Sequence, residues 1–182
     1  AGILAGISAL RSGGGKIFWA SNTDKLQRPP ELIHIEPTID SIKAAIDKNM
    51  TTAIIGPGLG KNFDKEIEFL WNSKFNIVLD ADGLDWLSRK KPKKRAAAWV
   101  GTPHIGEMQK LLKDDFSDKW SNITKLKKHY GGDWILKGPG TLVSEDSKIW
   151  LNLYSNGWLG TAGMGDVLAG IIAGLWASGS NA

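Results

Sequence analysis

Short apolar runs alternate with longer amphipathic stretches through most of the chain. Runs that are apolar throughout predict strands buried on both faces, and apolar residues at helical spacing predict helices. The predicted strands lie at 16–20, 32–35, 52–55, 76–79, 96–100 and 134–136, followed by a hairpin of 141–144 and 148–151. The predicted helices lie at 1–12, 38–49, 63–71, 106–113, 122–130 and 167–176. This alternation predicts an α/β fold with a mostly parallel sheet covered by helices on both faces.

The chain of 182 residues is long enough for one domain with a substantial core. No repeat or boundary divides it, so we expect residues 1–182 to form a single domain. It contains no Cys, which excludes a disulfide framework and a thiolate metal site. No apolar run approaches the ~20 residues of a membrane span, and the N-terminus has no signal-peptide pattern. We therefore expect a cytoplasmic protein without a membrane partner.

The formal net charge is +4, spread as Lys through segments that look like surface. The basic run Arg89–Arg95 (RKKPKKR) could contact nucleic acid, but a solvated loop is the favoured interpretation. No interleaved aromatic residues suggest an RNA-binding surface, so we expect no nucleic-acid partner. The nine Trp residues are scattered without a period and are interpreted as core or interface filling.

A glycine-rich segment followed by an apolar helix, Asn156–Ser178, carries the main chemical signal of the sequence. A glycine turn that leads into the N-terminus of a buried helix presents unpaired N–H groups, which form an anion site. Asp166 lies beside this site. Because a carboxylate repels a phosphate, Asp166 is interpreted as a general base or as an anchor for a substrate hydroxyl. The alternative is a helix N-cap, with the carboxylate accepting bonds from first-turn amides.

Five predicted strands are followed by polar or glycine clusters, the last of them after the hairpin. The clusters are GPGLG (56–60), DADGL (80–84), TPH (102–104), KGPGT (137–141) and GTAGMGD (160–166). Ligands of open α/β sheets bind beyond the carboxyl ends of the strands, so the clusters predict one shared site. Taken singly, each cluster has a plainer interpretation, such as a tight turn, a surface Lys or a packed loop His. Asp80 and Asp82 could cap the next helix, or could hold Mg²⁺ through water.

These motifs, in this order, resemble the ADP- or ATP-dependent NAD(P)H-hydrate dehydratase family of the ribokinase-like superfamily. The resemblance rests on GPGLG, LDADGL, TPHIGEMQKLL, LKGPGT and GMGDVLAGIIAGL, and the opening AGILAGISALRSGGG is similar to the family's first helix. It implies a three-layer α/β/α fold. It also implies a carbon–oxygen lyase that repairs the S form of hydrated NADH or NADPH. The nucleotide phosphorylates the ring hydroxyl, and loss of phosphate restores the cofactor.

The resemblance also implies the ligands and partners. ADP or ATP would be the phosphate donor, with Mg²⁺ as cofactor, and the hydrated cofactors NADHX and NADPHX would be the substrates. The similar region of bifunctional repair enzymes follows an epimerase domain. An N-terminal NAD(P)HX epimerase domain in a full-length protein, and a homo-oligomer, are therefore candidate partners.

Site roles follow from the resemblance position by position. The residues implied to contact the hydrated cofactor are Ala1, Gly58, His104 and Asp166, and Asp166 would take the proton from its hydroxyl. The residues implied to line the nucleotide site are Lys137, Gly138, Pro139, Gly140 and Thr141. The residues implied to offer amides to the transferred phosphate are Gly163, Met164 and Gly165.

The chain departs from the family pattern at Ser155, Trp158 and Ala162, where members usually have Gly. A Cβ at Ala162 is expected to narrow the anion-binding turn. The chain also begins without the family's first strand and stops at Ala182 without the usual closing helices. We therefore expect a fragment or a shortened relative, with a sheet edge left open.

Two other functions remain as alternatives to the dehydratase. One is a ribokinase-like kinase of a small alcohol such as a vitamin precursor, since such kinases have boxes related to TPHIGEM. The other is a catalytically impaired nucleotide-binding relative, which the substitutions at Trp158 and Ala162 favour. Turnover of hydrated NADH separates the dehydratase from both.

Overall fold

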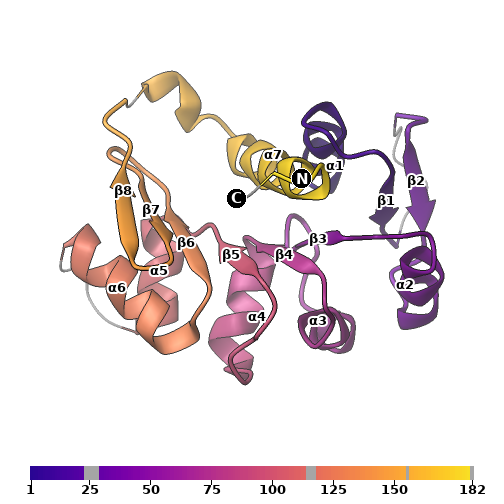
Figure 1. Cartoon of the computed structure of the whole chain (residues 1–182), viewed down its shortest axis with the longest axis horizontal. Helices are drawn as coiled ribbons and strands as arrows, with labels where there is room; N and C mark the ends of the chain where they lie inside the picture. Colours follow the sequence, from indigo (N-terminus) through magenta and orange to yellow (C-terminus); the bar gives the residue numbers. More distant parts are fainter. Residues whose placement is uncertain (23–28, 114–117, 155, 181–182) are drawn as a thin grey trace.

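The computed structural model of the protein describes residues 1–22, 29–113, 118–154 and 156–180. Its helices and strands alternate along most of the chain (Figure 1). The strands are β1 (Ile17–Ala20), β2 (Leu32–Ile35), β3 (Thr52–Ile55), β4 (Asn76–Leu79), β5 (Trp99–Gly101), β6 (Asp133–Leu136), β7 (Leu142–Glu145) and β8 (Lys148–Leu151). The helices are α1 (Gly2–Arg11), α2 (Ile39–Ile46), α3 (Asp64–Trp71), α4 (Asp82–Lys90), α5 (Ile105–Leu112), α6 (Lys119–Tyr130), the 3-10 helix η1 (Gly157–Gly160) and α7 (Met164–Ala177).

Six strands form one sheet in the order β3-β4-β5-β6-β7-β8, with the first four parallel and the last two antiparallel. β1 and β2 form a separate parallel pair. α1 and α7 lie side by side on one face of the larger sheet, and α3 and α4 lie on the other (Figure 1). The expected three-layer architecture with a mostly parallel sheet is confirmed.

A chain of aromatic rings fills the main core between the sheet and the helices α3 to α6. The ring centroids of Trp71 and Trp99 are 5.0 Å apart, and those of Trp99 and Trp134 are 5.2 Å apart. Trp86 packs on Trp71 at 5.7 Å. The core interpretation therefore holds for these four buried indoles, whereas Trp158 is 86% exposed.

α7 packs against α1 through small residues. A Cβ on Gly170 would collide with the carbonyl oxygen of Ala5, and one on Gly174 with that of Ala9. Only glycine lets the two backbones approach this closely. This contact fixes the position of α7 on the sheet, and with it the glycine turn at the start of α7.

The largest difference from the predicted elements is α4, and β5, α6 and α7 each begin three residues away from the predicted start. The pattern predicts no helix over 82–90, where α4 forms, so Arg89 and Lys90 belong to a helix and not to the expected solvated loop. Arg89 pairs there with Asp64 and Asp85. α7 begins at Met164, three residues before the predicted start, because small residues in its first turn hide the apolar period. Ser155, one of the departures from the family pattern, lies outside the described residues.

None of the helices in the described ranges has the length and apolar character needed to cross a bilayer.

Candidate functional site

The parallel register brings three strand ends to one edge of the sheet. Leu79 of β4 pairs with Gly101 of β5, and Gly101 pairs with Trp134 of β6. Beyond these strands, His104 and Lys137 form a further parallel bridge, in which the Lys137 amide donates to the Pro103 carbonyl at 2.9 Å. The TPH and KGPGT loops therefore lie side by side.

Asp80, directly after β4, anchors the side chain of Lys137. The Lys137 ammonium donates to Asp80 Oδ1 at 2.8 Å, and the Thr102 hydroxyl donates to the same oxygen at 2.7 Å. Asp80 is only 3% exposed, and Glu107 Oε2 lies 4.0 Å from the ammonium. A buried carboxylate with two donors holds the ammonium in one place because either group alone would be costly to bury.

The N-terminus of α7 lies next to the Lys137 ammonium. Gly163 is its N-cap, with φ +88° and no side-chain capping bond. The first intrahelical bond runs from Val167 N–H to the Gly163 carbonyl at 3.0 Å, so the amides of Gly165 and Asp166 precede the helical ladder. A Cβ on Gly165 would lie 3.3 Å from Lys137 Nζ and 3.7 Å from Asp80 Oδ2. Helix amides and a cation thus converge on one small space, which suits a phosphate group.

Asp166 lies inside the first turn of α7 and does not cap it, because the N-cap position is occupied by Gly163. The N-cap interpretation of Asp166 is therefore wrong. Its carboxylate is 18% exposed, and Oδ2 lies 3.7 Å from the Ala1 nitrogen. A Cβ on Gly58 would lie 2.9 Å from the Ala1 Cβ. The start of α7 therefore has three neighbouring residues beside it, namely Asp166, Ala1 and Gly58.

Contacts within the protein set the shape of the GPGLG loop. Gly56 has φ +124°, and a Cβ there would collide with the Asp80 carbonyl oxygen. The Gly60 amide donates to Asp82 Oδ2 at 2.8 Å. The N-cap of α4 is Ala81 and has no side-chain capping bond, so neither Asp80 nor Asp82 caps that helix as the alternative required. Among the described residues, no three or more His, Cys, Asp or Glu side chains are grouped so that they could hold a metal ion.

The KGPGT loop is held in place by a residue from another element. Gly138 and Gly140 have φ of +134° and +64°. Lys119 of α6 donates to the carbonyls of Pro139 and Gly140, the latter at 3.1 Å. Thr141 closes the loop by donating to the Gly138 carbonyl at 2.9 Å. Sequence reasoning missed Lys119 because a Lys at the start of a polar helix carries no local signal.

His104 caps α5 and keeps one ring nitrogen on the rim of the site. Its Nδ1 accepts from the Glu107 amide at 3.3 Å, and its own amide donates to Glu107 Oε2 at 2.8 Å, which completes a capping box. An accepting Nδ1 carries no proton, so the neutral ring has its proton on Nε2. The side chain is 62% exposed, and Nε2 lies 3.6 Å from Glu107 Oε2, so this nitrogen faces both the solvent and that carboxylate.

The chain combines a mostly parallel α/β sheet with a helix N-terminus suited to an anion, a cation beside it and a carboxylate in the same helical turn. A ribokinase-like superfamily protein from Enterococcus faecalis superposes with a TM-score of 0.85 at 22% identity, over 97% of this chain and 66% of that one. The family described as NAD(P)H-hydrate dehydratase matches residues 1–182. The chain therefore belongs to the NAD(P)H-hydrate dehydratase family.

Relatives within the family agree with this placement. A bifunctional NAD(P)H-hydrate repair enzyme from Coxiella burnetii is 33% identical over 94% of this chain, which spans 37% of that protein's length. An ADP-dependent (S)-NAD(P)H-hydrate dehydratase from Listeria monocytogenes is 32% identical over 97% of this chain and 67% of its own. The Bacillus subtilis ADP/ATP-dependent NAD(P)H-hydrate dehydratase, co-crystallised with ATP and Mg²⁺, superposes with a TM-score of 0.80 at 28% identity, over 97% of this chain and 67% of that one.

Proposed function

We propose that the protein dehydrates the S form of hydrated NADH or NADPH at the expense of a nucleotide, as a carbon–oxygen lyase of metabolite repair. The observation that carries the proposal is the position of the Lys137 ammonium beside Gly165 at the start of α7, with Asp166 in the same helical turn. Family membership over the whole chain supports the choice of substrate. A relative that is 32% identical is named as an ADP-dependent enzyme. We therefore propose ADP as the phosphate donor, with ATP as the alternative.

In the proposed first step, Asp166 accepts the proton of the ring hydroxyl as that oxygen attacks the terminal phosphorus of the nucleotide. An oxygen–phosphorus bond forms, and the bond from that phosphorus to the bridging oxygen breaks, so that ADP leaves AMP. The carbon–oxygen bond of the ring then breaks, and phosphate departs with the electron pair. The neighbouring ring carbon loses a proton, which restores the double bond of NADH.

Lys137 and the amides of α7 supply the positive charge for this transfer. Asp80 and Thr102 are proposed as positioning residues, because they hold the ammonium within reach of the helix amides. Charge placed in advance at the transferred phosphate stabilises the transition state without reorganisation. Oδ2 of Asp80 is directed toward the same space, which fits a hydrated Mg²⁺ carried in with the nucleotide. When bound, the ion would neutralise phosphate charge.

Ala1, Gly58 and the His104 Nε2 donor are proposed to bind the hydrated cofactor. The loop from Lys137 to Thr141, anchored by Lys119, is proposed to bind the adenine nucleotide. Two partners are proposed for testing. One is an NAD(P)HX epimerase domain in the full-length protein, and the other is a second copy of the chain.

The substitutions that favoured an impaired relative carry less weight in this geometry. Ala162 is exposed, and Trp158 is 86% exposed, so neither side chain packs into the turn from Gly163 to Gly165. The expected narrowing of the anion site by the Ala162 Cβ therefore has no support, and the dehydratase proposal stands ahead of the non-catalytic one.

The test is an absorbance assay at the reduced-nicotinamide band, with hydrated NADH or NADPH, Mg²⁺ and either ADP or ATP. The proposal expects absorbance to return with at least one nucleotide. Saturable nucleotide binding without turnover of the hydrates would favour the non-catalytic relative. Phosphorylation of another alcohol would favour the small-molecule kinase.

A further inference from the structure

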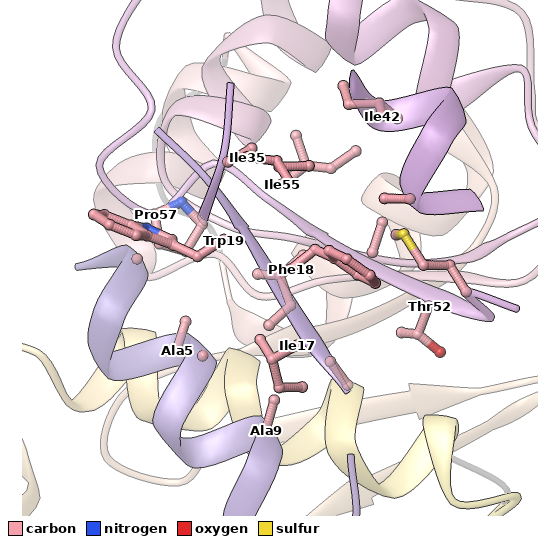
Figure 2. Close-up of a pocket in the computed structure, with 18 of the residues that line it drawn as sticks. Ala5, Ala9, Ile17, Phe18, Trp19, Ile35, Ile42, Thr52, Ile55 and Pro57 are labelled. Carbon is pink, nitrogen blue, oxygen red and sulfur yellow. The ribbon is translucent and has the colours of Figure 1, made fainter. Parts of the chain in front are cut away.

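The KGPGT loop lies outside the large cavity of the protein. That cavity, of about 890 Å³, lies between β1 and β3, and Figure 2 shows Phe18 and Trp19 of β1 together with Thr52 and Ile55 of β3 around it. None of residues 137–141 lines it. The conformation of the loop therefore depends on its neighbours at α6 and at the strand ends.

Three consecutive carbonyl groups of the loop accept hydrogen bonds from within the protein. The Gly138 carbonyl accepts from the Thr141 hydroxyl at 2.9 Å. The carbonyls of Pro139 and Gly140 both accept from the Lys119 ammonium, the latter at 3.1 Å. One side chain of α6 therefore fixes two adjacent peptide groups of the loop.

These two contacts also fix the direction of the loop amides. In a trans peptide the C=O and N–H groups point in opposite directions, and the described loop contains no cis peptide bond. Because the carbonyls of Pro139 and Gly140 are turned toward Lys119, the amides of Gly140 and Thr141 point away from it. A phosphate is repelled by carbonyl oxygens and attracted by amides. The loop therefore directs its amides, and not these carbonyls, to the side opposite Lys119.

The glycines of the loop make such an anchor important. Gly138 and Gly140 have φ of +134° and +64°, and glycine has more backbone freedom to lose than any other residue. A Cβ on Gly138 would lie 3.5 Å from Lys119 Nζ, so the ammonium packs directly on the loop backbone. The anchor orders the loop before the ligand arrives, which lowers the entropic cost of binding.

The position of Lys119 in α6 favours a role in the loop over a role in the helix. Lys119 is the first residue of α6, where the helix dipole disfavours a cation. Its neighbour Asp118 is the N-cap and accepts from the amide and the hydroxyl of Ser121, at 2.9 and 2.5 Å. Asp118 therefore stabilises the start of the helix, whereas the Lys119 ammonium donates to the loop.

We propose that Lys119 is a positioning residue of the nucleotide site, which holds the KGPGT loop in its binding conformation through the carbonyls of Pro139 and Gly140. The inference rests on the proposed function, since it takes this loop to bind ADP. In this role Lys119 acts through the loop and not on the reacting atoms. Its loss should raise the KM for ADP and leave kcat at saturating ADP close to the wild-type value.

Calorimetric titration with ADP tests the proposal on the wild-type protein and three variants. Lys119→Met keeps the apolar stem and removes the donors, whereas Lys119→Arg keeps a cation with several donors. Lys128→Met, which removes an exposed lysine of the same helix, is the matched control. The proposal expects the Kd for ADP to rise by about tenfold or more in Lys119→Met, as for the loss of hydrogen bonds to a charged group. The other two variants should stay near the wild-type value.

Titration with the cofactor hydrate and thermal unfolding separate a local effect from a general loss of structure. The hydrate should bind all four proteins alike. An unchanged Kd for ADP in Lys119→Met would overturn the proposal, and so would an equal loss of affinity for ADP and for the hydrate. A Lys119→Met protein that no longer folds would also overturn it, because the residue would then serve stability.

The control variant and turnover complete the test. Equal weakening of ADP binding by Lys128→Met would contradict the proposal, since it would show a general effect of charge. Selective weakening by Lys119→Met in a protein that does not turn over hydrated NADH would support the role of Lys119 and contradict the dehydratase function. The two proposals can therefore fail separately.

Discussion

We propose that Asp166 acts through its charge and not through helix capping. The cap of α7 is a glycine, so the carboxylate is free to face Ala1 and the opening of the anion turn. Lys137, by contrast, is fixed by a buried partner 57 residues away in the chain. At the scale of single residues, the site combines one partly exposed carboxylate with one immobilised cation.

Asp166→Asn is expected to lower turnover of hydrated NADH by about 10²–10⁴-fold, the usual effect of losing a general base. The melting temperature should change little because the side chain makes no capping bond. Kinetics and thermal unfolding on the same preparations provide the check, with Asp40→Asn, in the first turn of α2, as a matched control. Retained turnover with a large drop in melting temperature would remove Asp166 from the chemistry.

The two ring nitrogens of His104 have separate proposed roles, so two substitutions can test them separately. His104→Ala loses both the cap and the Nε2 donor, whereas His104→Asn keeps a cap acceptor and loses only the donor. Both variants should weaken binding of the cofactor hydrate and leave ADP affinity nearly unchanged. Only the Ala variant should also lose about 0.5–2 kcal/mol of stability. Calorimetric titration with ADP would show an error in this assignment as a large loss of nucleotide affinity.

At the scale of elements, the contact between α1 and α7 fixes the position of the glycine turn at the start of α7. Gly170→Ala is expected to push the helices apart, because its Cβ would meet the backbone of Ala5. Overpacking of this kind costs about 1–3 kcal/mol, measurable by urea unfolding. Gly157→Ala is the matched control, since nothing lies within 4 Å of the added Cβ. Equal stability of the two variants would mean that α1 and α7 are not in close contact.

The link between α3 and α4 should give stability a specific pH dependence. Hydrogen bonds from Arg89 and Lys90 lower the pKa of Asp64 to about 2 from its ordinary value of 3.8. A depressed carboxyl pKa stabilises the folded state above the unfolded pKa, and that contribution disappears as the pH falls from about 4 to about 2. Asp64→Asn should therefore be less stable at pH 7, with a smaller difference near pH 2. A difference independent of pH would show that the ion pair contributes nothing.

Local patterns predicted the strands and most helices well because their apolar runs are short and sharply bounded. β2, β3 and β4 match the predicted residues without change. The start of α7 was missed because its first turn consists of small residues, and α4 was missed because charged residues dilute its apolar face. The pairs Asp80–Lys137 and Lys119–Gly140 depend on tertiary packing, and no local pattern encodes them.

At the scale of the whole molecule, two sheets and one site are arranged around the start of α1 and α7. The loops after β4, β5 and β6 supply Asp80, His104 and Lys137, while the start of α7 supplies the anion turn.

The stoichiometry of a single reaction tests the central claim most directly. Hydrated NADH is incubated with the protein, Mg²⁺ and ADP, while NADH is followed by absorbance and AMP and phosphate by ³¹P NMR. Phosphoryl transfer to the ring hydroxyl predicts that each NADH restored is accompanied by one AMP and one phosphate, and that Asp166→Asn suppresses all three together. NADH formed without nucleotide consumption, or nucleotide consumed without NADH, would contradict a transfer at the start of α7.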